Sequence, residues 1–210
     1  MTGRVRGLPP GRAGRTWLRR RRGVAAHGAD LLEQKLRALA AEETGFALRA
    51  ERSRVAWEEA VAELDQWVLR SVLLGAERGI RLAGDGADTA VEVEWRVTMG
   101  VRYPASASCR VARADAECAP EATAALIPAA QAAERAVLAA VDHAVASAAL
   151  TAVRDEIAAT RRRRRALTER WIPRLDAASA ELTVALEDQE HEEQVRLRWA
   201  AGRGTGRGFR

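Results

Sequence analysis

The stretch LRRRRGVAAHGADLLEQKLRALAAEETGFALRAERSRVAWEEAVAELDQWVLRSVLL, residues 18–74, decides the fold. Alternating steps of four and three residues along it meet mostly apolar side chains, and this spacing keeps one stripe of a long helix against a partner helix. No proline interrupts the stretch. Such a helix would be on the order of 90 Å long, so we expect an equally long partner. The seam consists of Leu18, Arg22, Ala25, Ala29, Leu32, Leu36, Leu39, Glu43, Phe46, Ala50, Ser53, Trp57, Ala60, Leu64, Trp67, Ser71 and Leu74.

A second seam lies near the other end of the chain. In an antiparallel helix pair, the position numbers of facing core residues have a constant sum. A sum near 207 puts Glu43 opposite Arg164, the two charges that most conspicuously break their seams, and Gly79 opposite Pro128. We therefore expect one antiparallel coiled coil within the chain, with Glu43 and Arg164 as the pair that sets its register. The second seam consists of Leu150, Val153, Ile157, Thr160, Arg164, Leu167, Trp171, Leu175, Ala178, Leu182, Ala185 and Gln189.

The period of the sequence changes between the two seams. Every second residue from Val91 to Tyr103 is apolar or aromatic, and the run ends at Pro104. A period of two predicts a half-buried strand or a tight hairpin. A weaker alternation at Ala107, Cys109 and Val111 offers a second strand. So small a sheet is not stable alone, and we expect a β-containing head on the coiled coil.

The sequence thus predicts a mainly all-α fold in which a small β-hairpin-containing head lies between two long antiparallel helices. We expect five segments: a flexible basic arm at 1–15, the first helix at 16–79, the head and its connector at 80–128, the second helix at 129–199, and a disordered Gly/Arg tail at 200–210. Pro173 lies inside the second helix, where it should cause a kink or break a hydrogen bond.

Charge is distributed unevenly along the chain. Charged residues make up 30% and aromatic residues 4% of a sequence whose net charge is +5. All eight basic residues before position 23 are arginines, and no acid accompanies them. Such asymmetry is compatible with an acidic protein partner, a nucleic acid or an anionic surface. The candidate contact residues on the first helical turns are Arg12, Arg15, Arg19, Arg20, Arg21 and Arg22.

No constellation of residues in the sequence indicates catalysis. The three histidines lie far apart, no phosphate-binding loop is present, and Cys109 and Cys118 form neither a disulfide framework nor a metal site. We expect no cofactor, no metal and no enzymatic activity. The sequence has no apolar run that we expect to span a bilayer, and the arginine pair at Arg19 lacks the hydrophobic region of an export signal.

Three stretches, in order, resemble the D subunit of V-type/A-type ATPases and ATP synthases. The first runs from Pro10 to Leu39 and includes the only lysine of the chain, the second lies around Met99, and the third follows the run of arginines at 161–165. An acid-rich and then basic segment at 187–197 is similar as well. The residues that carry the resemblance are Gly28, Leu31, Leu32, Lys35, Leu39, Met99, Gly100, Val101, Pro104, Leu167, Ile172, Pro173 and Leu175.

This resemblance implies a central-stalk rotor shaft without chemistry of its own. The implied partners are the catalytic A and regulatory B subunits of a hexamer, the small F subunit of the stalk and an adaptor on the membrane rotor. It implies coupling of ATP synthesis or hydrolysis to proton or sodium transport, and a cytoplasmic location at the membrane periphery without direct insertion. The resemblance implies no nucleic-acid partner. The alternative interpretation is an arginine-rich coiled coil that binds nucleic acid or acts as a scaffold.

Overall fold

The computed structural model describes residues 7–83, 89–111 and 124–204. Our expectations for the start of the basic arm, the turn at 84–86, most of the connector (112–123, with Cys118) and the tail from 205 onward lie outside the described residues. Residues 11–15 and 200–204, which we expected in the flexible arm and the disordered tail, are helical because the long helices extend through them. The chain divides into two compact units. Unit 1 comprises Met1–Leu36 and Ala159–Arg210, and unit 2 comprises Arg37–Ala158.

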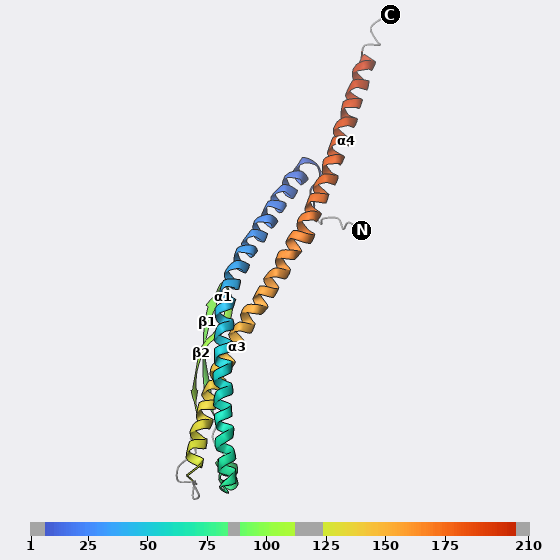
Figure 1. The fold of residues 1–210 in the computed structure, drawn as a ribbon. Coiled ribbons are helices and arrows are strands. Elements are labelled where there is room, and N and C mark those ends of the chain that lie inside the picture. Colours follow the sequence, from blue (N-terminus) through green and yellow to red (C-terminus); the bar gives the residue numbers. More distant parts are fainter. Residues whose placement is uncertain (1–6, 84–88, 112–123, 205–210) are drawn as a thin grey trace, which may run out of the picture. The chain divides into compact units, whose positions relative to one another are not determined.

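Long helices dominate the chain (Figure 1). They are α1 (Gly11–Leu73), α3 (Leu126–Arg165) and α4 (Ile172–Gly204), and the strands β1 (Ala90–Thr98) and β2 (Val101–Arg110) lie between α1 and α3 in sequence. This confirms the predicted fold class. The expected first helix is interrupted after Leu73, where Gly75 adopts a φ of 82°, and α2 (Glu77–Ala83) follows. Glycine suits this turn because a Cβ is unfavourable at positive φ.

The largest fully buried side chains belong to the two predicted seams. On α1, Leu18, Leu39 and Ser71 are at most 2% exposed, and on α3 the same holds for Val153 and Thr160. The predicted second seam begins only at Leu150, and before it most of the buried positions of α3 are alanines, which were not predicted as seam residues. Small side chains let two helices approach closely. Each unit is therefore held together by α1 packing against the C-terminal helices. The buried alanines of α3 are Ala129, Ala132, Ala136, Ala146 and Ala149.

The register of the helix pair differs from the predicted one. In unit 2, Arg154 donates to Glu43 over 2.8 Å, and in unit 1, Arg164 Nε lies 2.8 Å from Glu33. The position numbers of each pair add up to 197. The contacts of Ser53 with His143 and of Ser71 with Ala125 give 196. The predicted sum of 207 and the predicted pairing of Glu43 with Arg164 are therefore wrong, because each charge finds a partner elsewhere on the facing helix.

The other predicted match, Gly79 opposite Pro128, is nearly met in unit 2. A Cβ on Gly79 would lie 2.9 Å from Leu126 Cδ1, two residues before the expected proline. The register at this end differs from the rest because the chain turns at 74–76 before α2 begins.

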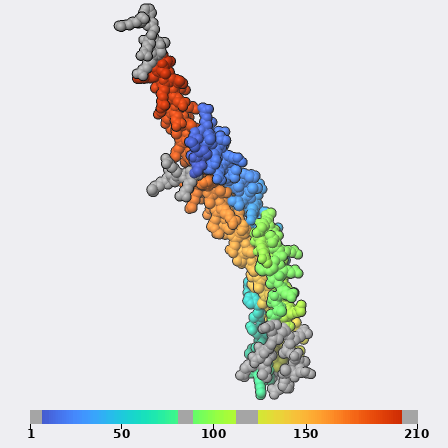
Figure 2. Space-filling view, turned by 180° about the vertical axis from the view of Figure 1, so that it is seen from behind, coloured from blue at the N-terminus to red at the C-terminus, as the bar shows by residue number. Residues whose placement is uncertain are grey.

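The hairpin lies along the helices of unit 2 (Figure 2). β1 and β2 pair antiparallel around a turn at Met99 and Gly100, with an irregularity between Glu94 and Trp95. On the inner strand, Tyr103 contacts Phe46 of α1 edge-to-face, with ring centroids 5.0 Å apart. Arg49 donates a hydrogen bond of 3.1 Å to the carbonyl of Ala105. β2 is thus the strand that attaches the sheet to the helices.

Pro173 does not end the second long helix. The six residues Ala166–Trp171 form a π-helical segment, η2, in which the N–H of Ile172 donates to the carbonyl of Leu167. Proline has no N–H to donate, and its ring crowds the carbonyl four residues earlier. The wider π turn removes this conflict, and α4 continues without a break in the helical chain.

In the described chain, the continuous helical run Leu126–Ala201 contains a stretch that is long and apolar enough to cross a membrane, judged by length and composition alone. This corrects the expectation that no such run exists. Core helices pass the same test, and here the apolar character comes from the alanine-rich first part. That part buries Ala132, Ala136 and Ala146 within unit 2.

The core of unit 1 includes the segment before α1. Leu18, Ala25 and Leu175 form its buried centre, and Leu8 packs against it. Gly14 makes this arrangement possible, because a Cβ at this position would lie 2.2 Å from the carbonyl oxygen of Pro9 and 3.1 Å from Leu182 Cδ2.

The register is testable by cross-linking. In a background with both natural cysteines replaced by serine, we expect Glu33→Cys with Arg164→Cys to form an internal disulfide under mild oxidation. The pair Glu33→Cys with Arg174→Cys, which the sum of 207 would bring together, should stay reduced. Peptide mass analysis reads out both, and the reverse outcome would show that the register described here is wrong.

Replacing Ser71 tests a buried polar contact. Its hydroxyl lies 2.8 Å from the carbonyl of Trp67 and 3.1 Å from that of Ala125 at the start of α3. Ser71→Ala leaves buried carbonyls with one partner fewer, so the free energy of unfolding should fall by about 1 kcal/mol in urea titrations followed by circular dichroism. Ser147→Ala is the control, because Ser147 bonds only within its own helix. Equal losses in the two variants would contradict the assignment.

Gly14→Ala and Gly23→Ala should have opposite effects. The first forces the segment around Pro9 away from α1 and lowers the free energy of unfolding by roughly 1–3 kcal/mol. Gly23 has no atom within 4 Å of its would-be Cβ. Gly23→Ala should therefore raise stability by about 1 kcal/mol through helix propensity. Thermal unfolding measures both, and a stabilised Gly14→Ala variant would refute the close contact.

Candidate functional site

The described residues offer no cluster of metal ligands, because they contain no group of three potential ligands. The hydrogen bonds that Arg54 donates to Glu51 lower the pKa of that carboxyl, and Glu51 and Glu58 together raise the pKa of Arg54. This exposed cluster is a surface ion pair along one helix.

The N-terminal arginine cluster, Arg12, Arg15 and Arg19–Arg22, lies on the exposed side of the first turns of α1. Two of its members pair with α4: Arg12 lies 3.1 Å from Glu190, and Arg22 lies 2.6 Å from Asp176. Arg21 stacks over Trp17 at 5.1 Å. Among the described residues, Arg15, Arg19 and Arg20 have no ion-pair partner. Within the part of the chain that the structure describes, three positive charges are thus free for an external partner.

The two ion pairs also explain how α1 tolerates this cluster. The N-terminal end of a helix is the positive end of its dipole, so arginines there are unfavourable. The first turn of α1 contains no acidic residue. Glu190 supplies negative charge beside the first turn from the facing helix, and Asp176 balances Arg22 about three turns further along. Because both pairs are exposed, each contributes at most about 1 kcal/mol.

A second basic surface of unit 1 is the α3 arginine run, residues 161–165. Arg164 is engaged with Glu33, whereas Arg161, Arg162 and Arg165 are exposed. Among the described residues, these three have no ion-pair partner. Sequence reasoning expected one arginine of the run to face the seam, and Arg164 is the half-buried one.

The first group of family-like residues lies along α1. Leu39 is 2% exposed and belongs to the core, and Leu32 and Lys35 are half-buried. Leu31 is 50% exposed and lies outside the seam. A Cβ on Gly28 would lie 3.7 Å from Leu167 Cδ1, so the first and third groups meet in unit 1.

The central group builds the hairpin turn. Met99 and Gly100 have φ values of 52° and 78°. Positive φ at both central positions is what a tight two-residue hairpin turn requires. Val101 is buried, and Pro104 is buried opposite Trp95. These four residues therefore position β2 on the helices.

The third group surrounds the π-helical segment. Leu175 is 1% exposed, and Leu167 and Ile172 pack against the same core cluster. Pro173 is exposed and follows the π turn directly. This group has a packing role in unit 1.

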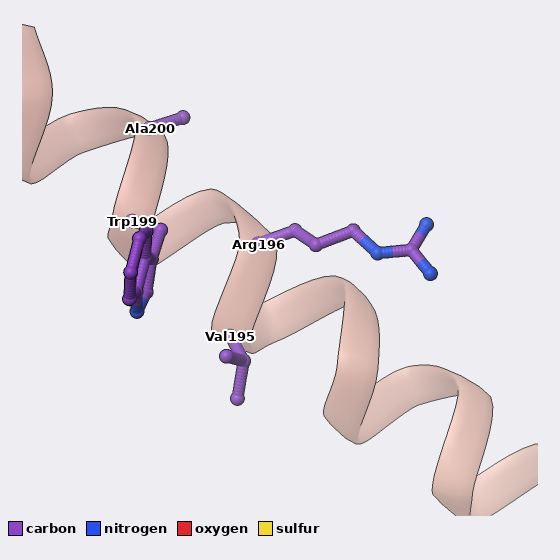
Figure 3. A pocket seen from close by; sticks show the side chains of 4 residues that line it. All are labelled: Val195, Arg196, Trp199 and Ala200. Carbon is purple, nitrogen blue, oxygen red and sulfur yellow. The ribbon is translucent and has the colours of Figure 1, made fainter.

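Sequence reasoning missed two exposed apolar surfaces. One is β1, which was expected to be half-buried, yet Val91, Val93, Trp95 and Val97 are between 40% and 67% exposed. The other is the end of α4, where Val195 and Trp199 project to one side of the helix and Arg196 to another (Figure 3). In unit 1, α4 continues past the start of α1 (Figure 1), so this end has no facing turn of α1. Periodicity could not reveal either surface, because it says which residues share a face and not what covers that face.

The family model for the D subunit of ATP synthase matches residues 16–202. The match includes both long helices, the hairpin and all three groups of family-like residues. No curated protein matches the chain at a significant level. Because the match covers most of the sequence, the chain belongs to the ATP synthase D-subunit family, the structural stalk subunits of rotary ATPases.

Proposed function

We propose that this stalk subunit is a rotating central shaft that couples ATP synthesis or hydrolysis to ion transport. The observation that carries the proposal is the family match over residues 16–202, which spans both helices and the hairpin between them. The proposed partners are a hexamer of catalytic A and regulatory B subunits, the small F subunit and an adaptor on the membrane rotor. The complex would hold the chain on the cytoplasmic side, peripheral to the membrane.

The physical mechanism needs no chemistry in the chain itself. A helix pair is asymmetric around its axis, so three equivalent sites in a surrounding ring would each meet a different face of it. Different contacts bias each site towards a different conformation, and rotation changes which site is biased to which state. The chain would have no catalytic role, and each of the three sites would contact a given face of it in turn.

The free arginines of the N-terminal cluster support a contact with the hexamer. Arg15, Arg19 and Arg20 are exposed and have no ion-pair partner among the described residues. Exposed charges attract an acidic wall over a range of about 10 Å at ordinary salt without locking into one geometry. Such a contact allows rotation, since no fixed set of bonds must break at each step.

The test uses the purified chain and a separately prepared, nuclease-treated A–B hexamer. Reversing three charges with Arg15→Glu, Arg19→Glu and Arg20→Glu should weaken binding by about tenfold or more in sedimentation assays. The matched control is Arg37→Glu, Arg52→Glu and Arg110→Glu, which changes the net charge equally at exposed positions of unit 2. The control should bind like the unmodified chain.

Two outcomes would count against the proposal. Equal weakening of hexamer binding in both triple variants would show that binding depends on the net charge of the chain and not on the N-terminal arginine cluster. If the unmodified chain bound no hexamer and did not change its ATPase activity, the shaft assignment itself would fail.

A further inference from the structure

The outer strand of the hairpin is an open edge. β1 pairs only with β2 in the described chain, and eight of its nine residues are exposed. Exposed strand edges present unpaired N–H and C=O groups, which another strand can satisfy. Thr98, the last residue of β1, is the half-buried one.

The face of β1 that carries its apolar residues is also uncovered. Val91, Val93, Trp95 and Val97 alternate along the strand, and Trp95 is 52% exposed beneath the guanidinium of Arg102, 4.6 Å from the ring. An apolar edge of this kind promotes association unless something covers it. Trp95 lines a shallow pocket together with Ser147 and Thr151 of α3. The ring contact and the hydrogen bond with α1 are both made by β2.

The turn fixes which backbone groups of β1 point outward. Thr98 and Val101 flank the two-residue turn, so the backbone groups of Thr98 point towards β2. The direction in which the backbone groups point alternates from residue to residue along an antiparallel strand. The N–H and C=O groups at the open edge are therefore those of Val97, Trp95, Val93 and Val91. The irregularity beside Trp95 leaves its extra residue, Ala105, on β2, so the alternation along β1 continues.

We propose that two copies of the free chain associate through β1, antiparallel, with Trp95 facing Trp95 on the two-fold axis. In this register Glu94 of each copy lies opposite Arg96 of the other, and Val93 lies opposite Val97. Outward-pointing residues face outward-pointing residues, as ladder hydrogen bonds require. The two hairpins join into one four-stranded sheet, which is more stable than a two-stranded one.

The charges of β1 select this register among its neighbours. Centring the pair on Glu94 would place Glu94 opposite itself, and centring it on Val93 would place Glu92 opposite Glu94. Like charges directly opposite each other destabilise a sheet. Centring on Trp95 creates two opposite-charge pairs, and Glu92 then faces the uncharged Thr98. The complementarity lies within nine residues of one chain, which is why we assign the edge to a second copy.

The experiment is analytical ultracentrifugation of the full chain over a concentration series. We expect a monomer–dimer equilibrium for the unmodified protein. Either Glu94→Arg or Arg96→Glu alone creates two pairs of like charges, one on each side of the two-fold axis. Each variant should therefore raise the dissociation constant of the dimer about tenfold. The double variant Glu94→Arg with Arg96→Glu restores both opposite-charge pairs and should restore dimerisation.

The matched control is Glu92→Arg, the same charge change two residues away but opposite Thr98. It should leave the dissociation constant within about twofold. Circular dichroism would verify that each variant keeps its helical content. A monomer at every concentration would overturn the proposal, as would a dimer insensitive to Glu94 and Arg96 or one weakened equally by Glu92→Arg. The dimer does not depend on the rotor assignment, since the hexamer is absent from this experiment.

Discussion

Burial of two apolar stripes against each other is the constraint on which the structure depends. A single long helix cannot bury its own stripe, so α1 needs the C-terminal helices in both units. The stripe of α3 is built largely from alanines, and Leu18, Leu39 and Leu175 supply bulk elsewhere. A pair of helices buries side chains only where its two stripes meet, and it has no other interior. The hairpin must therefore lie on the outside, and strands on the outside of a thin support keep one edge open.

The larger part of each seam, unlike the register, could be read from the sequence, although Trp57 and Leu74 of the first seam are exposed. Which residues of a helix share a face is a property of that helix alone, and Thr160, Val153 and Ser71 were placed on the seams correctly. Register is a relation between two helices. A slip of three seam steps keeps seam residues opposite seam residues, so apolar pattern alone cannot choose. Charge matching misled because exposed ion pairs are worth little, and Glu43 and Arg164 each had another partner available.

Prediction of the surfaces was likewise partial. The arginines at the start of α1 were identified as contact candidates from their unbalanced charge, but the sequence did not show that Arg12 and Arg22 are engaged with α4. Alternation identified β1 as a strand. It did not show that its apolar residues stay exposed, because coverage depends on neighbours far away in the sequence. The family match adds the assignment to a rotary ATPase stalk, which neither pattern nor geometry supplies.

The π-helical segment before Pro173 has a consequence for how this sequence can change in length. Deleting one residue from Ala166–Trp171 would rotate everything after it by about 100° relative to the preceding helix. Leu175 and Leu182 would then turn away from the face that meets the core of unit 1. Exchanges of one residue type for another are tolerable at its exposed positions, such as Glu169 and Arg170, whereas Leu167 and Trp171 pack against the core. Insertions and deletions are not tolerable, so evolutionary drift at this site should preserve the residue count more strictly than the residues themselves.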